Sequence, residues 1–152
     1  MASLRDKLLD PAVRPGAVEA TCRLVDDEVG AKRGISGAAI KTAYGVVGRL
    51  KPRIYNDVVD KLLPDFADAL EPFHERAQRE AQARDLSLAQ ALESVFEDDQ
   101  PAVAEALLGV TDRRIDDARQ PIKGTYERLR GTAKTHVAGA VPGLARALGK
   151  FL

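Results

Sequence analysis

Two histidines and one cysteine are the residues of this 152-residue sequence best suited to metal binding or nucleophilic chemistry. Glu71 and His74 have the spacing with which ferritin-like bundles present two metal ligands from one helix. Such a site needs a second E-x-x-H pair, but the residue three positions before His136 is Ala133. With Asp68 nearby, the cluster suits only an adventitious divalent ion. We therefore interpret it as a solvated acidic helix face and leave metal binding open.

Cys22 shares an apolar stripe with residues 18, 25 and 29, which indicates a small buried hydrophobic side chain. A lone cysteine excludes an internal disulfide and any multi-cysteine zinc or iron–sulfur site. A catalytic thiol needs a positioned base, and the sequence places no histidine beside it. It also contains no nucleophilic-serine motif and no paired-carboxylate signature. We expect no enzymatic activity, catalytic residue, resident metal or cofactor.

The stretch AKRGISGAAIKTAYGVV, residues 31–47, has three functional interpretations. As a phosphate loop it fails, because Ile40 stands where the second glycine belongs. As an RNA-clamping GXXG loop it lacks the three-stranded sheet on which such domains are built. The third interpretation is a DNA-binding helix-turn-helix over residues 29–48.

Several residues match the helix-turn-helix pattern, namely Val29, Gly34, Ile35, Ser36, Ile40 and Ala43. Gly30 and Arg33 depart from it, and the second helix offers few long donors to base edges. The candidate nucleic-acid contacts are Lys32, Arg33 and Lys41. A purely structural explanation is that two helices meet at a glycine-rich turn and Ser36 caps the second one. We favour the structural explanation and do not expect nucleic acid as the partner.

The last 25 residues, RLRGTAKTHVAGAVPGLARALGKFL, combine an apolar stripe with basic residues and no acid. The cations are Arg128, Arg130, Lys134, Arg146 and Lys150. This profile is typical of helices that lie on anionic lipid surfaces or in partner grooves. However, residues 57–99 carry twelve acidic against four basic side chains. We therefore favour a terminal core helix whose cations face the acidic middle of the chain.

The elements that must position these residues are all predicted to be helices. Ser3 and Ser87 suit helix N-caps, and Pro101 suits a first turn. Pro64, Pro72 and Pro142 are expected to begin, bend or interrupt helices. No segment combines β-branched enrichment with sustained alternation. We predict an all-α fold, one compact bundle of seven to nine helices without a sheet, forming a single domain over residues 1–152.

Composition and hydrophobic spacing give the expected core and setting. Apolar residues make up 45% of the chain and charged residues 30%, values typical of a globular protein. Neither a signal peptide nor a membrane span is evident, so we expect a cytoplasmic protein. The residues expected to be largely buried are Val18, Val25, Ile40, Tyr44, Val47, Val58, Leu62, Phe66, Leu70, Phe73, Leu107 and Val110.

Four stretches carry a family resemblance: SLRDKLLDPAVRPGAV, SGAAIKTAYGVVGRLKP, LLPDFADALEPF and ALLGVTDRR. They resemble a family of small actinobacterial proteins that is classed as a domain of unknown function. The resemblance covers most of the chain and is weakest between residues 75 and 98. It implies a cytoplasmic bacterial protein and carries over no catalytic residue, cofactor or partner.

Together these observations favour a non-enzymatic protein-interaction module or a self-associating protein, whose partner is another protein or a second copy. The alternatives are DNA binding through residues 29–48 and anionic-lipid surface binding through residues 128–152.

Overall fold

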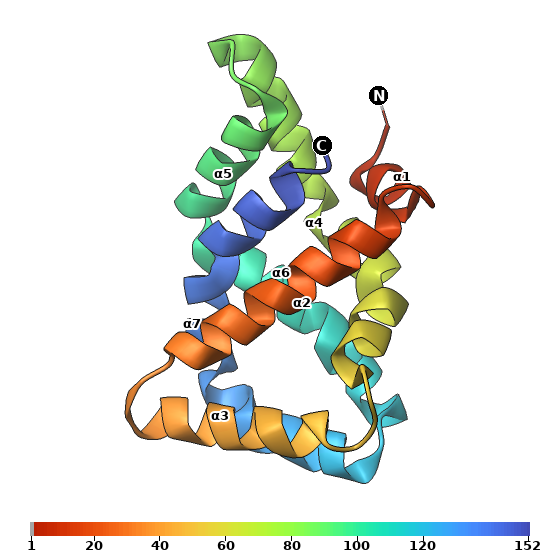
Figure 1. Ribbon diagram of the computed structural model, residues 1–152. Helices are drawn as coiled ribbons and strands as arrows, with labels where there is room; N and C mark the ends of the chain where they lie inside the picture. Colours follow the sequence, from red (N-terminus) through yellow and green to blue (C-terminus); the bar gives the residue numbers. More distant parts are fainter. Residues whose placement is uncertain (1) are drawn as a thin grey trace.

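The computed structural model describes residues 2–152, and every regular element among them is helical (Figure 1). Seven α-helices and one short 3-10 helix follow one another: α1 Leu4–Leu9, α2 Arg14–Ala31, α3 Gly34–Gly48, α4 Ile54–Arg84, α5 Leu88–Asp98, α6 Gln100–Arg114, η1 Ile115–Asp117 and α7 Gln120–Gly149. No strand occurs among these residues. The all-α prediction and the predicted helix count are confirmed.

Local capping signals in the sequence set three of the helix starts. The Ser3 hydroxyl accepts a hydrogen bond from the backbone N–H of Asp6 at 3.0 Å. Ser87 and Gln90 form a reciprocal capping box at the start of α5, with bonds of 3.1 and 3.0 Å. Pro101 lies in the first turn of α6, where its missing N–H removes no helical bond. These three predictions are confirmed because each depends only on neighbouring residues.

The predictions that Pro64, Pro72 and Pro142 begin or interrupt helices are wrong. Pro64 and Pro72 lie inside the continuous 31-residue helix α4, and Pro142 lies inside the 30-residue helix α7. An interior proline costs about 3 kcal/mol in an isolated helix. Both helices pack against at least four other elements along their length, and this burial outweighs the local cost.

The connection between α2 and α3 also differs from expectation. Ser36 does not cap α3, because the helix begins two residues earlier at Gly34, with Arg33 at the cap position. Gly34 has a φ of +77°, which favours glycine. A Cβ at Gly37 would lie 2.9 Å from the backbone carbon of Lys32. Both glycines are therefore required by the tight turn between the two helices.

Helices α2, α3 and α4 form the three sides of a triangle, and α6 and α7 lie behind it (Figure 1). Helix α3 connects the end of α2 to the start of α4 as the lower side. Helix α5 packs against α4 and α7 above. The best-packed part of the core includes Phe96, Leu92 and Val95 of α5 together with Leu4 and Leu8 of α1.

Most of the residues expected in the core are shielded from solvent, but fewer than half are fully buried. Among the twelve expected residues, Val58 alone is exposed, at 38%. Five are buried, namely Val18, Val47, Leu62, Leu70 and Val110, and the remaining six are half-buried. Four of those half-buried residues and Val58 line one cavity, which explains their incomplete burial.

The short helix α1 is held on α4 by a buried polar cluster around His74. Glu71 accepts a hydrogen bond from the backbone N–H of Leu4 at 2.7 Å, which satisfies one free donor at the helix start. The Lys7 ammonium donates to Nε2 of His74 at 3.0 Å. Because Nε2 accepts, Nδ1 carries the ring proton and donates to Glu71 at 3.2 Å. The ring is 0% exposed, so His74 does not lie on a solvated face as predicted, whereas Asp68 and Glu75 of the same helix are exposed.

We expect the His74→Ala substitution to destabilise the protein by about 2–4 kcal/mol, because it leaves a cavity and removes a shared partner from two charged groups. Urea unfolding followed by circular dichroism measures this loss. Glu75→Ala is the matched control, since Glu75 is the next residue of α4 and is exposed. It should change the unfolding free energy by less than about 0.5 kcal/mol. Equal effects of the two substitutions would contradict the role assigned to His74.

A candidate apolar ligand site

A cavity of about 380 Å³ lies between α2, α3, α4, α6 and α7. Its wall is almost entirely aliphatic and aromatic. The principal lining residues are Leu24, Val25, Val29, Ile40, Val58, Val59, Leu62, Leu63, Phe66, Leu70, Leu107, Leu108, Val137, Ala140, Val141, Leu144 and Leu148. Leu8 of α1 contributes as well. This size and composition match those of small-molecule sites in proteins.

The wall consists of apolar stripes that the sequence already marks as inward-facing. On α4, lining residues recur at 58, 59, 62, 63, 66, 67 and 70, as expected for one face of a helix. On α7 they recur from 136 to 148 in the same way. Each stripe covers twelve residue steps, or about 18 Å along its helix. The lining residues therefore extend over about 18 Å of each helix, a length that suits an extended chain.

The cavity is partly open, so its apolar wall is in contact with water. An apolar occupant would remove that contact, which contributes about 25 cal/mol for each Å² of wall that it covers.

Three of the lining residues are ionisable: Glu28 and Lys32 on α2 and His136 on α7. The Lys32 ammonium lies 3.6 Å from the Glu28 carboxylate. It also lies 4.0 Å from the position that a Cβ on Gly139 would take, which places it against α7 within one turn of His136. Burial, and then the positive charge of Lys32, lower the pKa of His136 below its usual 6.5. The Glu28 carboxylate lies farther along α7, 3.7 Å from the position of a Cβ on Gly143. These three residues are the charged part of an otherwise apolar wall.

Two stacked tyrosines tie α3 to its neighbours beside the cavity. The rings of Tyr44 and Tyr55 stack with their centroids 4.2 Å apart. Tyr44 donates a hydrogen bond to Asp26 of α2, and Tyr55 donates to the backbone carbonyl of Tyr44. Burial, followed by the charge of Asp26, raises the pKa of Tyr55 to about 12. Burial, followed by the hydrogen bond to Asp26, also raises the pKa of Tyr44, so both hydroxyls stay protonated donors at neutral pH. Tyr44 was expected in the core, whereas no periodicity in the sequence pointed to Tyr55.

The residues predicted to contact nucleic acid have three different surroundings. Lys32 belongs to the cavity wall, with its side chain 18% exposed. Arg33 turns back to donate to the carbonyls of Gly30 and Lys32, at 3.3 and 3.1 Å. Lys41 is exposed on α3. Ile35, which a helix-turn-helix would bury, is 93% exposed, so that part of the resemblance is wrong.

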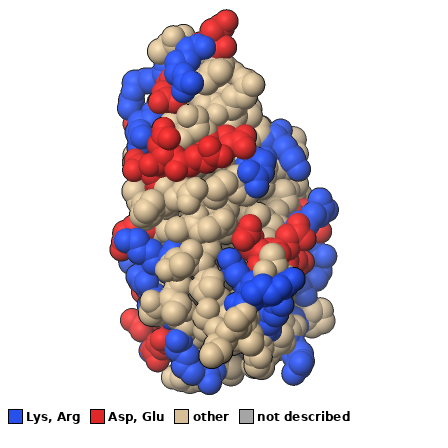
Figure 2. All heavy atoms as spheres, turned by 90° about the vertical axis from the view of Figure 1, so that its left-hand side faces the viewer, with Lys and Arg blue, Asp and Glu red and all other residues tan. Residues whose placement is uncertain are grey.

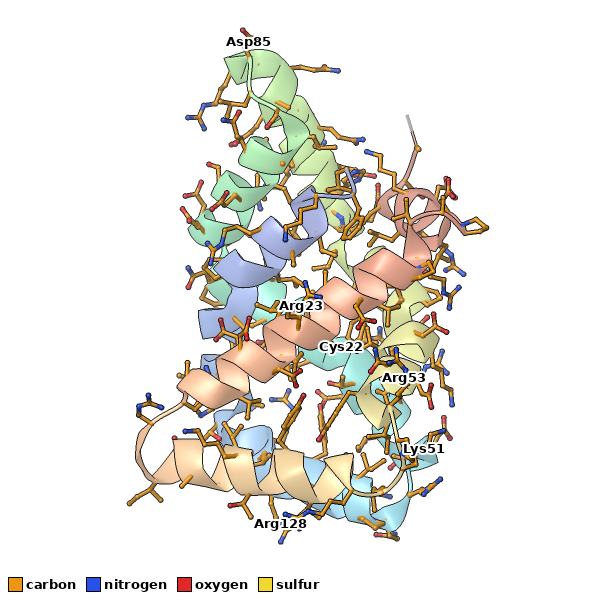
Figure 3. All side chains as sticks on the ribbon, viewed as in Figure 1. Cys22, Arg23, Lys51, Arg53, Asp85 and Arg128 are labelled. Carbon is orange, nitrogen blue, oxygen red and sulfur yellow. The ribbon has the colours of Figure 1, made fainter. Side chains whose placement is uncertain are left out.

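Three of the five C-terminal cations are paired with acids of α5 and α6. Arg130 contacts Asp112 at 2.8 Å, Lys134 contacts Glu105 at 2.6 Å and Arg146 contacts Glu93 at 3.5 Å. The hydrogen bond from Arg130 holds the pKa of Asp112 below its usual value. Arg128 lies at the lower edge of the view in Figure 3, and both it and Lys150 are exposed.

Charges of both signs are interspersed on the face that includes α5 and α7 (Figure 2). That face presents no continuous basic surface. None of the helices in the described part of the chain has an apolar run long enough to span a lipid bilayer.

Cys22 lies on α2 near Arg53 and the start of α4 (Figure 3). It is half-buried and packs against the core, as a small hydrophobic side chain would. Burial, followed by the charges of Glu19 and Asp26, raises the pKa of its thiol. The thiol is therefore protonated and weakly nucleophilic at neutral pH.

Over residues 2–152, no three histidine, cysteine, aspartate or glutamate side chains gather in a way that could hold a metal ion. Glu71 and His74 bind each other, and Asp68 pairs instead with Arg5 at 2.5 Å. The structure therefore does not bring together the three residues considered for an adventitious ion.

The sequence profile of one protein family matches residues 4–152, which is nearly the whole chain. The chain belongs to DUF6918, a family of unknown function. No curated protein and no solved structure matches it. Membership of DUF6918 therefore assigns no activity to the chain, and the structural feature that bears on its function is the cavity.

If the cavity is empty space, filling it should stabilise the protein. We expect Ala140→Leu, which extends a lining side chain, to raise the unfolding free energy by about 1–2 kcal/mol. Ala145→Leu is the matched control, because Ala145 lies on the same helix but is 0% exposed in the packed core. It should lower the unfolding free energy by about 1–3 kcal/mol through overpacking. Urea unfolding of both variants checks the signs, and destabilisation by Ala140→Leu would show that the space is already filled.

Proposed function

We propose that this protein is a non-enzymatic binding protein that holds an elongated apolar molecule in the cavity between α2, α3, α4, α6 and α7. The observation that carries the proposal is the cavity itself: about 380 Å³, lined by apolar residues of five helices. An apolar ligand would remove these walls from water at about 25 cal/mol per Å², and this burial is the driving force for association.

The polar groups at the cavity favour binding over catalysis. The Thr21 hydroxyl donates to the carbonyl of Ala17 at 2.8 Å, and the Thr111 hydroxyl donates to that of Leu108 at 3.0 Å. Neither hydroxyl has a side-chain base as its hydrogen-bond partner within the described chain, as an activated nucleophile would require. Thr21 bonds its own helix, and Thr111 bonds its own helix and the Tyr126 hydroxyl of α7 at 2.8 Å. The ionisable residues of the wall are Glu28, Lys32 and His136.

A self-associating or protein-interaction role is the second candidate, and the outer face of α3 supports it. Ile35 and Val46 are 93% and 42% exposed. They are eleven residues apart and therefore lie on the same face of the helix. DNA binding through residues 29–48 and lipid-surface binding through residues 128–152 stay alternatives. Both have less support, because Lys32 lines the cavity and three C-terminal cations are paired. The cytoplasmic location and the actinobacterial origin stay predictions.

The test is a titration with N-phenyl-1-naphthylamine, an uncharged fluorophore whose emission rises in apolar surroundings. We expect saturable binding with a dissociation constant on the order of micromolar, as for a ligand of this size in an apolar pocket. Ala140→Phe, which fills the cavity, should weaken binding at least about tenfold, the effect of roughly 1.4 kcal/mol. Ala39→Phe on the exposed side of α3 is the matched control and should bind normally.

A filled variant that binds as well as the unchanged protein would place the fluorophore elsewhere and reject the cavity as its site. Loss of binding in Ala39→Phe alone would instead point to the outer face of α3, and so to the second candidate.

A further inference from the structure

We propose that the ligand is a long-chain carboxylic acid whose carboxylate is bound by Lys32 and His136. This inference rests on the proposed function, since it assigns the class of molecule that fills the same cavity. It is carried by the placement of charge, because Lys32 and His136, two of the three ionisable residues of the wall, lie within one turn of each other along α7. The third, Glu28, pairs with Lys32 and lies beside Gly143, farther along the same helix.

Lys32 has donors to spare. An ammonium group has three N–H donors. In the described part of the chain, Glu28 is its one charged partner, and their separation of 3.6 Å is longer than a strong charge-assisted bond. The side chain is only 18% exposed, so water satisfies the remaining donors poorly. A carboxylate at the end of the cavity would accept one of them in surroundings where a charged hydrogen bond is strong.

His136 is the second contact, on the opposite wall of the same end. Within residues 2–152 its ring makes no hydrogen bond to another residue, in contrast to His74, whose two ring nitrogens are both engaged. The charged group facing it is Lys32 of α2, while the lining residues of α3, α4 and α6 carry no charge. The Glu28 carboxylate lies about two turns farther along α7, 3.7 Å from the position of a Cβ on Gly143. Burial and Lys32 lower the pKa of His136. An anion beside it would reverse that shift and make the ring a second cationic donor.

Glu28 sets the charge of the head group. With Glu28 ionised and His136 neutral, the cluster carries no net charge, and proton uptake by His136 brings it to a single positive charge. That charge matches a monoanion, whereas a doubly charged phosphate monoester would be repelled by Glu28. Beyond His136 the lining residues of α7 are all apolar, and this stripe of about 18 Å up to Leu148 suits one hydrocarbon chain.

The experiment compares laurate with 1-dodecanol, which has the same chain length and no charge, as competitors of the bound fluorophore. We expect both to displace it at neutral pH, with laurate at least about tenfold tighter because of the charged hydrogen bonds. Lys32→Met should bring laurate to the level of dodecanol and leave dodecanol unchanged. Lys41→Met, an exposed lysine on α3, is the matched control and should change neither.

The second readout is the imidazole titration of His136 followed by NMR. Laurate should raise the pKa of His136 and dodecanol should not. The sign follows from linkage: because binding takes up a proton, the affinity for laurate is greatest at low pH and falls as the pH rises through the pKa of the bound state. Over the same pH range the affinity for dodecanol should stay constant.

The outcomes distinguish a failure of the proposed function from a failure of the carboxylate assignment. If neither compound displaces the fluorophore and the fluorophore itself fails to bind, the proposed function is wrong. If both compounds displace it equally, and neither Lys32→Met nor the titration of His136 distinguishes them, the cavity binds apolar molecules and the carboxylate assignment is overturned.

Discussion

The rigid span of α3 is the constraint on which the cavity depends. A 15-residue helix is about 22 Å long. Its connections to α2 and α4 are short, only Lys32 and Arg33 on one side and residues 49–53 on the other. The end of α2 therefore cannot close onto the start of α4 without breaking α3. The Tyr44–Tyr55 stack and the bond from Tyr44 to Asp26 hold this triangle in place, so the apolar stripes face one another across a gap.

This constraint explains which parts of the fold follow from the sequence. Caps at Ser3 and Ser87 depend on hydroxyls and N–H groups a few residues apart, so the letters alone suffice. Pro64 and Pro142 could not be assigned correctly in the same way, because the packing of α4 and α7 against several helices decides whether those helices continue. Hydrophobic periodicity correctly indicated that Phe66 and Leu107 face inward. Periodicity gives the direction in which a side chain points but not its distance from the opposite wall, so the cavity could not be predicted from the sequence.

The same limit applies to the site. Lys32 was considered as a contact to nucleic acid because it precedes a glycine-rich turn, and only the packing of α2 on α7 shows that it lines a cavity. The sequence does not indicate a binding role for His136, because Lys32, the charged residue that acts on it in the fold, is more than a hundred positions earlier in the chain. A close approach of α2 to α7 at Gly143, where a Cβ would come within 2.7 Å of Leu24, is one signal that a sequence can carry. Glycine inside a helix indicates such an approach without naming the partner.

The two histidines show how one fold gives the same side chain different uses. His74 lies between Lys7 and Glu71, with both nitrogens bonded and no exposed surface, so it is fixed and serves packing. By holding α1 on α4 it also keeps Leu8 in the wall of the cavity, beside the core residues that close that end. His136 lies about 18 Å along α7 from Leu148, at the charged end of the same space. The hydrogen-bonded cluster around His74 thus supports the apolar end of the cavity. Lys32 and His136, whose hydrogen bonds are incomplete, lie where a bound carboxylate can complete them.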